Sequence, residues 1–149
     1  MAIKQSEWAL GNNQAKRPQT AGAVHAQRFR YNVVGAKGAI AAGDILEIGE
    51  LPPYCKIVDA KLYTNGTFTG LTADVGLLTG EYGDALDAAR TVDKLLFDAA
   101  DLTVLSRLTK TDGLKLEDAQ VSRGIGLKFS AAIPAAAAKY IVLELDYIQ

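Results

Sequence analysis

Short segments in which apolar and polar residues alternate recur along most of this chain, and this alternation limits its fold more than any other feature. Successive side chains of a β-strand point to opposite faces, so a period of two predicts a strand with one buried face. Glycine and proline turn signals separate the segments, as at Pro52-Pro53 and Asn65-Gly66. The pattern predicts strands at 23–34, 44–51, 55–64, 72–79, 122–130 and 139–148.

Within these segments the apolar side chains form sets that should face the interior of a sheet structure. In the first segment, Phe29, Tyr31 and Val33 alternate with polar residues. Gly124 and Gly126 lie inside a strand pattern, which predicts a bulge or a close approach of another part of the chain. The apolar sets of the later segments are Val58, Ala60 and Leu62; Ala73, Val75 and Leu77; Ile125, Leu127 and Phe129; and Ile141, Leu143, Leu145 and Tyr147.

Six or more short strands separated by turns indicate a mainly β protein, either a β-sandwich or a jelly-roll-like barrel. The middle of the chain differs, because residues 84–105 are rich in alanine and leucine. Here Leu95, Ala99 and Leu102 recur at helical spacing, which predicts a short helical insertion. Residues 1–20 show neither period, so we expect an extended N-terminal arm followed by a single domain over residues 21–149.

The composition fits one globular domain. The chain has 149 residues, of which 49% are hydrophobic, and a net charge of −1, so it can bury a core without covalent cross-links. Its single cysteine excludes an intrachain disulfide and fits a reducing compartment. No apolar run approaches the roughly 20 residues that span a bilayer, so we expect no membrane partner. The start has no apolar signal-peptide region, which indicates synthesis in a cytoplasm.

The charge is distributed unevenly, with a basic N-terminal stretch. Residues 1–31 contain five basic side chains and one acid, so this stretch carries +4 and the remainder −5. Such a stretch can bind an acidic protein or a nucleic acid, and we favour a protein because the basic residues are few and lack interleaved aromatic residues. Tryptophan is favoured at interface centres, so Trp8 either anchors the arm in a neighbouring subunit or folds back on its own domain. The residues expected to contact a partner are Trp8, Lys16, Arg17, Arg28 and Arg30.

A search for catalytic, cofactor-binding or metal-binding groups yields no site. With His25 as the only histidine and Cys55 as the only cysteine, a zinc site lacks ligands and a catalytic triad would depend on His25 alone. The glycines lack the spacing of a phosphate-binding loop, and the aspartates at 84–101 do not match a calcium-binding loop. Glu47 and Glu50 could meet other acids, but a chain with 17 acidic residues always offers such pairs. We therefore predict no enzyme, no cofactor and no metal ion.

Residues 43–80 have a distinctive succession of turns and strands. They contain GDILEIGELPPYCKIVDAKLYTNG followed by TADVGLLTG. This succession resembles a pattern in small structural proteins of tailed-bacteriophage virions, in which a strand opened by GD precedes a proline turn, an I-V-D-A-x-L strand and a D-V-G strand. The later LLFDAADL and KYIVLELDY resemble the segments that follow there. The resemblance extends from Gly43 to the end of the chain and carries no site motif, so it transfers no functional residues.

The resemblance implies a non-enzymatic virion protein of the capsid decoration or cement type, with a β-sandwich or jelly-roll fold. Such a subunit binds the outside of the capsid lattice as a dimer or trimer and stabilises it. The implied partners are the major capsid protein and further copies of this chain. Two alternatives stay open. One is another virion component, such as a head-fibre base, a tail part or a host-binding module. The other is a carbohydrate-binding β-sandwich, for which the available aromatic rings are Tyr54, Tyr63, Tyr82, Tyr140 and Phe68.

Overall fold

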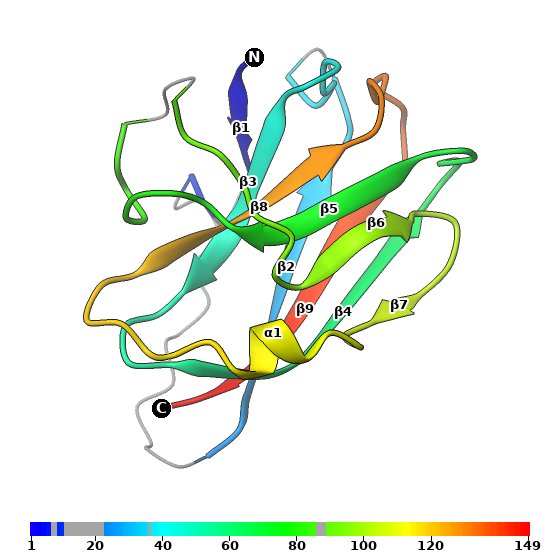
Figure 1. Ribbon diagram of the computed structural model, residues 1–149. Coiled ribbons are helices and arrows are strands. Elements are labelled where there is room, and N and C mark those ends of the chain that lie inside the picture. The colour runs from blue at the N-terminus through cyan, green and yellow to red at the C-terminus, as the bar shows by residue number, and fades with distance from the viewer. Residues whose placement is uncertain (7–8, 11–22, 36, 86–88) are drawn as a thin grey trace.

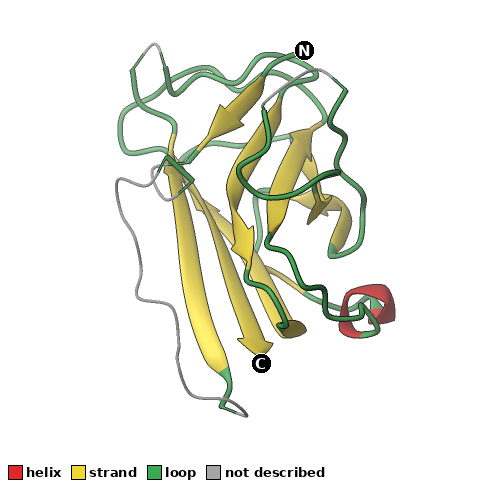
Figure 2. Cartoon of the chain, turned by 90° about the vertical axis from the view of Figure 1, so that its left-hand side faces the viewer, coloured by secondary structure: helices red, strands yellow, loops and turns green. Residues whose placement is uncertain are grey.

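Two β-sheets pack face to face in this protein and confirm a mainly β sandwich, with no closed barrel (Figures 1 and 2). The computed structural model describes residues 1–149 except 7–8, 11–22, 36 and 86–88. The strands are β1 (Ile3–Gln5), β2 (His25–Asn32), β3 (Ile45–Leu51), β4 (Lys56–Asn65), β5 (Thr72–Leu77), β6 (Phe97–Asp101), β7 (Ser106–Arg107), β8 (Arg123–Phe129) and β9 (Tyr140–Ile148), and α1 spans Thr111–Leu114.

The strand order mixes distant parts of the chain. The five-stranded sheet has the order β1-β3-β8-β5-β6, and the four-stranded sheet has the order β2-β9-β4-β7. All pairs are antiparallel except β1 with β3, which is parallel. β1 lies at one end of the sandwich, whereas α1 and the C-terminus lie at the other (Figures 1 and 2).

The apolar sets predicted from the alternation meet between the two sheets. β9 has β2 and β4 as its two neighbours, and its inward residues Ile141, Leu143, Leu145 and Tyr147 are at most 1% exposed. Phe29 contributes to the same core from β2 and is fully buried. Because burial of apolar surface is the main favourable contribution to folding, this interior fixes which face of each strand points inward.

A bulge in β4 overturns one predicted facing. The register between β4 and β9 shifts between Ile57 and Asp59. As a result Ile57 is buried and Val58 is exposed, although Val58 was expected to share the inner face with Ala60 and Leu62. One inserted residue reverses the facing of everything on its far side, and the alternation alone does not reveal where the insertion lies.

The prediction of a helical insertion within residues 84–105 is wrong for the described residues. They form β6 and turns, and Ala99 has a positive φ of 49°. The aspartates accept backbone N–H groups two residues ahead, as Asp93 does from Leu95 at 3.0 Å and Asp101 from Thr103 at 2.8 Å. Such local bonds compete with a helix. The short helix α1 occurs instead after β7, outside residues 84–105, and no helix among the described residues is long and apolar enough to cross a membrane.

The start of the predicted arm is part of the sandwich. β1 pairs with β3 through Ile3↔Ile45, Lys4↔Leu46 and Gln5↔Glu47. A three-residue strand is too short for a period of two to be recognised, so this strand was not predictable from the sequence. Most of the remaining arm, and with it the predicted boundary at residue 20, lies outside the described residues and stays a prediction.

Candidate partner-binding surface

The outward face of the four-stranded sheet is the strongest candidate for a partner-binding surface. Along β2, the side chains of Arg28, Arg30 and Asn32 are exposed and alternate with core residues. The register places Glu144 of β9 beside Arg28, and Lys61 of β4 beside Glu144. This face therefore carries polar and charged rows from three adjacent strands, as is usual for the solvated face of an antiparallel sheet.

The outward face of the five-stranded sheet is covered over its centre. A Cβ atom at Gly126 would lie 3.0 Å from Leu78 and from Val92, and one at Gly76 would overlap Asp93. The segment around 78–93 therefore packs directly on the glycines of β5 and β8. The close approach predicted from Gly124 and Gly126 is confirmed. Among the described residues, the four-stranded sheet therefore has the more open outward face.

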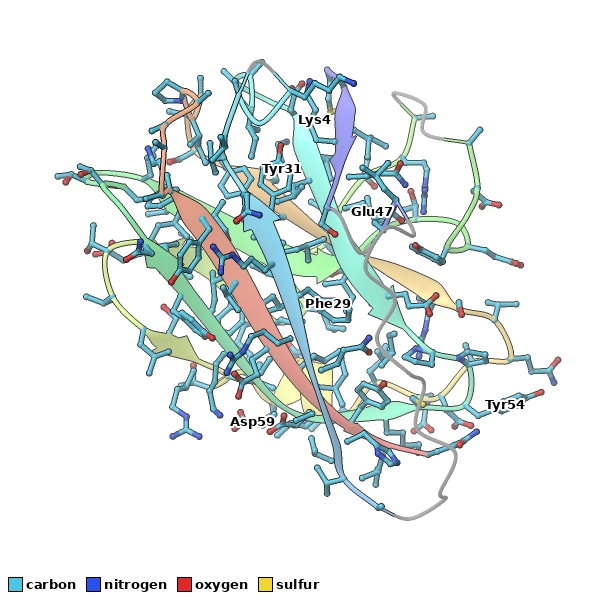
Figure 3. All side chains as sticks on the ribbon, turned by 180° about the vertical axis from the view of Figure 1, so that it is seen from behind. Lys4, Phe29, Tyr31, Glu47, Tyr54 and Asp59 are labelled. Carbon is cyan, nitrogen blue, oxygen red and sulfur yellow. The ribbon has the colours of Figure 1, made fainter. Side chains whose placement is uncertain are left out.

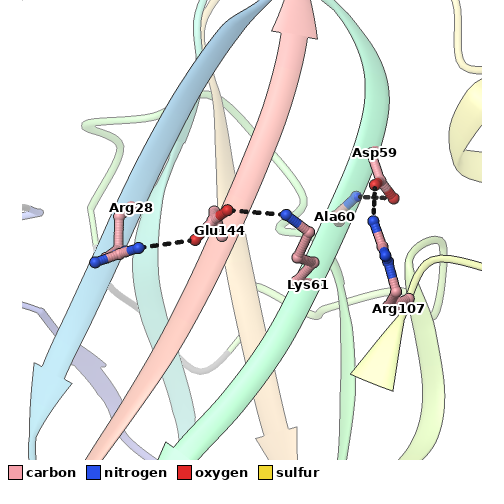
Figure 4. Close-up of polar contacts among 6 residues, drawn as sticks. All are labelled: Arg28, Asp59, Ala60, Lys61, Arg107 and Glu144. Atoms are coloured by element: carbon pink, nitrogen blue, oxygen red, sulfur yellow. Dashed lines mark hydrogen bonds and ion pairs between the residues drawn. The ribbon is translucent and has the colours of Figure 1, made fainter. Parts of the chain in front are cut away.

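Two sets of ion pairs cross the open face (Figure 4). Glu144 accepts from Lys61 Nζ at 3.0 Å and from Arg28 Nη2 at 3.2 Å, and Asp59 pairs with Arg107 at 3.2 Å. The hydrogen bond from Lys61, reinforced by that from Arg28, lowers the pKa of Glu144 against the opposing effect of burial. Each pair contributes little to stability at this exposure, so the network chiefly fixes where the charges lie.

The same face combines arginine with tyrosine. The Arg30 guanidinium carbon lies 3.8 Å from the ring centre of Tyr140, and its Nε donates to Asn32 at 2.8 Å. Tyr63 lies near Arg28 and, after Glu144, contributes to raising the pKa of that guanidinium. Arginine and tyrosine are enriched at protein interfaces, because each combines apolar area with a polar end.

The structure brings together only part of the predicted contact set. Arg28 and Arg30 share the outward face of β2, whereas Trp8, Lys16 and Arg17 lie outside the described residues. Sequence reasoning missed Lys61, Tyr63 and Tyr140 as neighbours of these arginines. Their alternation already indicated outward positions on two strands, but nothing in the sequence showed that β9 lies between β2 and β4. The aromatic residues offered for carbohydrate binding do not all reach one surface, since Phe68 is 1% exposed.

A buried polar cluster lies beneath the segment that covers the five-stranded sheet. Glu47 of β3 is 1% exposed; its Oε2 accepts from Gln5 Nε2 at 3.1 Å, and its Oε1 lies 3.9 Å from Arg90 Nη1. Arg90 also donates to the carbonyls of Thr79 at 2.8 Å and Glu81 at 3.1 Å. At 3.9 Å Arg90 forms no hydrogen bond with Glu47. The effect of burial therefore exceeds the opposing effects of Gln5 and Arg90, and it raises the pKa of Glu47.

The raised pKa of Glu47 has a consequence for stability against pH. Between the ordinary glutamate value and the raised one, the folded state holds a proton that the unfolded state has lost. Stability should therefore fall as the pH rises through that window. We expect the wild-type protein to lose stability relative to Glu47→Gln, measured by urea unfolding at steps from about pH 4 to pH 7. The opposite contribution of Glu144 is common to both proteins and cancels, so a difference that stays constant or grows in favour of the wild type contradicts this assignment.

The single histidine and the single cysteine line one pocket. A pocket of about 180 Å³ at the end of the sandwich near the C-terminus is bordered by His25, Tyr54, Cys55 and Tyr147, together with Pro52, Pro53 and Gln149. Burial raises the pKa of the Cys55 thiol, which disfavours the reactive thiolate. Among the described residues no three His, Cys, Asp or Glu side chains gather as metal ligands.

Chains of solved bacteriophage structures share this fold. A chain in the capsid of Ralstonia phage GP4 superposes with a TM-score of 0.84 at 34% sequence identity, over 99% of this chain and 98% of that one. A chain in the capsid of the Helicobacter pylori bacteriophage KHP30 matches with a TM-score of 0.55 at 13% identity, over 87% and 90% of the two chains. A chain in the cyanophage Pam1 capsid gives 0.51 at 15% identity, over 93% and 94%.

The three likenesses differ in weight. The last two have identities at which only the fold is shared. The first covers nearly all of both chains, and its identity of 34% shows that the two chains belong to one family. No protein-family model and no curated protein matches the chain.

Proposed function

Since this chain belongs to the family of bacteriophage capsid proteins that includes the matched chain of Ralstonia phage GP4, we propose that it is a capsid decoration or cement subunit. In this role it binds the outside of the capsid lattice and stabilises it without catalysis. The observation that carries the proposal is the match at 34% identity over 99% of this chain and 98% of the matched chain.

The open face of the four-stranded sheet supports attachment to an existing lattice. A stable protein–protein contact buries roughly 800 Å² on each partner. The described residues have a total accessible surface of 7495 Å², so one such patch is about a tenth of it. The face bearing Arg28, Arg30, Tyr63 and Tyr140 offers charged and aromatic groups together, and we assign it the contact with the major capsid protein.

The basic N-terminal arm offers the same subunit a second site of contact. Trp8, Lys16 and Arg17 are proposed to contact a neighbouring capsid subunit or a further copy of this chain, within a homodimer or homotrimer. Contacts on separate elements of one subunit add by avidity, which suits a protein that holds adjacent lattice subunits together.

Binding to capsid shells tests the proposal. Shells of the phage that encodes the chain, assembled without this protein, should bind it saturably and resist heating better once it is bound. The variants Trp8→Ala and Arg28→Gln/Arg30→Gln should each weaken binding by about tenfold, which is 1.4 kcal/mol. Point variants are needed because deletion of residues 1–20 would also remove β1 from its sheet. The matched control is Lys110→Gln/Lys115→Gln. It removes the same two positive charges as Arg28→Gln/Arg30→Gln, but beside α1, at the end of the sandwich away from β1.

Three results would contradict the proposal in different ways. If no shell forms without this protein, it builds the lattice instead of decorating it. If it ignores shells and copurifies with tails or head fibres, it is another virion component. If it binds neither but binds immobilised glycans, the carbohydrate-binding alternative holds.

A further inference from the structure

A groove opens at the end of the sandwich where β1 lies. It has a volume of about 330 Å³ and lies between β1, the C-terminal end of β2 and the loop that follows β2. Its lining combines Lys4 and Lys37 with the apolar side chains of Ile3, Leu10 and Val34. Leu10 and Val34 are each 53% exposed, so the groove offers accessible apolar surface beside the two lysines.

The N-terminal strand holds Lys4 in place from one side. The Ile45 N–H donates to the Ala2 carbonyl at 3.0 Å, and the Ser6 N–H donates to the Glu47 carbonyl at 3.0 Å. These two bonds fasten both ends of β1, and the parallel register puts Lys4 on the same side of the sheet as Leu46, a core residue. Lys4 therefore lies on the side of β1 that faces the other sheet, close to Tyr31 (Figure 3).

The loop after β2 holds Lys37 in place from the other side. The Tyr31 hydroxyl donates to the Lys37 carbonyl at 3.3 Å and to the Gly38 carbonyl at 3.1 Å. Gly38 packs so closely on the backbone of Val34 that a Cβ atom there would lie 2.4 Å from the Val34 nitrogen. The loop is thus closed on itself and tied to the core by a buried tyrosine, so the wall carrying Lys37 is preformed.

The two lysines differ from several other basic residues of this protein. Arg28, Lys56, Lys61, Lys94 and Arg107 all pair with carboxylates at 3.4 Å or less. Among the described residues, neither Lys4 nor Lys37 has a carboxylate within ion-pair distance. Within the part of the chain that the structure describes, the groove therefore presents two ammonium groups without counter-charges beside exposed apolar side chains, a combination complementary to acidic and apolar residues of a partner.

We propose that this groove docks an extended acidic segment of a partner protein, with apolar residues of that segment packed on Leu10 and Val34. The inference rests on the proposed function, in which that partner is a protein of the capsid lattice. A short extended strand suits the site, because β1 is an edge strand of its sheet and all three of its residues line the groove. A nucleic acid suits it less, since recognition of a phosphate backbone needs a broader basic surface than two lysines.

Charge reversal in the groove provides the first test. We expect Lys4→Glu/Lys37→Glu to bind capsid shells at least about tenfold more weakly than the wild type and with a smaller dependence on salt. The matched control Lys110→Glu/Lys115→Glu reverses the same charge at the far end and should bind like the wild type. If charge reversal impairs folding, Lys4→Gln/Lys37→Gln replaces it, because this variant removes the same charges without adding new ones. Its melting temperature is measured to show that it is folded. Wild-type binding with unaltered binding by all groove variants overturns this inference alone, whereas failure of the wild type to bind overturns the proposed function.

Photo-crosslinking identifies the occupant. A benzoylphenylalanine at Val34, mixed with the same shells, should capture a segment rich in Asp and Glu, and the same probe at Leu114 should not. Leu114 is similarly exposed, at 48%, and lies in α1 at the opposite end. A crosslink from Val34 to nucleic acid, to a basic segment, or to nothing when the protein is bound would overturn the proposal.

Discussion

Replacing Phe29 with alanine is expected to lower the free energy of unfolding by about 3–5 kcal/mol, the range for removing a fully buried aromatic side chain. Phe29 projects from β2 into the space between the sheets and is 0% exposed (Figure 3). Its ring lies against Gly49, at the bulge of β3, where a Cβ atom would be only 2.5 Å from the ring carbons. The surrounding strands belong to two hydrogen-bonded sheets, so they cannot close around the cavity without breaking their register.

The contact with Gly49 makes this prediction more specific. Gly49→Ala alone should cost about 1–3 kcal/mol, because the added methyl group has to displace a ring that has no free space. In the Phe29→Ala background the same methyl group enters the vacated volume, so Gly49→Ala should then be neutral or stabilising. Such a change of sign is a strong coupling between the two sites.

Equilibrium unfolding in urea measures all four proteins of this cycle. Tyr54→Ala removes a half-exposed aromatic ring and should cost less than about 1 kcal/mol, which controls for loss of an aromatic side chain as such. Additive effects of the Phe29 and Gly49 substitutions would show that the ring does not occupy the position described here.

Arg90→Leu is the second large effect, with an expected loss of about 3 kcal/mol. The substitution leaves the carbonyls of Thr79 and Glu81 without their donor and leaves Glu47 buried without its nearest cation. Removing one partner of a buried pair is costly because the remaining charge stays dehydrated. The loss should therefore be greater at pH 7 than at pH 4, where Glu47 can take up a proton.

Arg107→Leu is the matched control, since it makes the same substitution in a shorter but exposed ion pair. Arg107 lies 3.2 Å from Asp59 and its side chain is 62% exposed, so its loss should cost less than about 1 kcal/mol. Adding Glu47→Gln to Arg90→Leu should restore part of the stability by removing the buried charge. If Arg90→Leu and Arg107→Leu lower the free energy of unfolding by equally small amounts, the Glu47–Arg90 cluster does not hold the segment around 78–93 on the sheet.

The strands and their inner faces were predictable from the sequence because the period of two depends only on residues close together in the chain. Ile141, Leu143, Leu145 and Tyr147 were assigned to one face from their spacing, and all are buried. The exceptions are local as well. Val58 is the inserted residue of the β4 bulge, and the aspartates near 93–101 form turns that the alanine-rich composition did not reveal. Helix propensities differ by less than about 1 kcal/mol per residue, so such side-chain bonds and the pairing of β6 with β5 outweigh them.

By itself the sequence determined the class of the fold, the faces of most strands and the outward position of Arg28 and Arg30. Only the tertiary structure decided that β9 lies between β2 and β4, which gathers Arg28, Glu144 and Lys61 in one row. It alone paired β1 with β3, buried Glu47 beside Arg90, and placed Lys4 opposite Lys37. The physical reason is that alternation reports which side of a strand is apolar, whereas the neighbour of each strand depends on contacts between residues far apart in the chain.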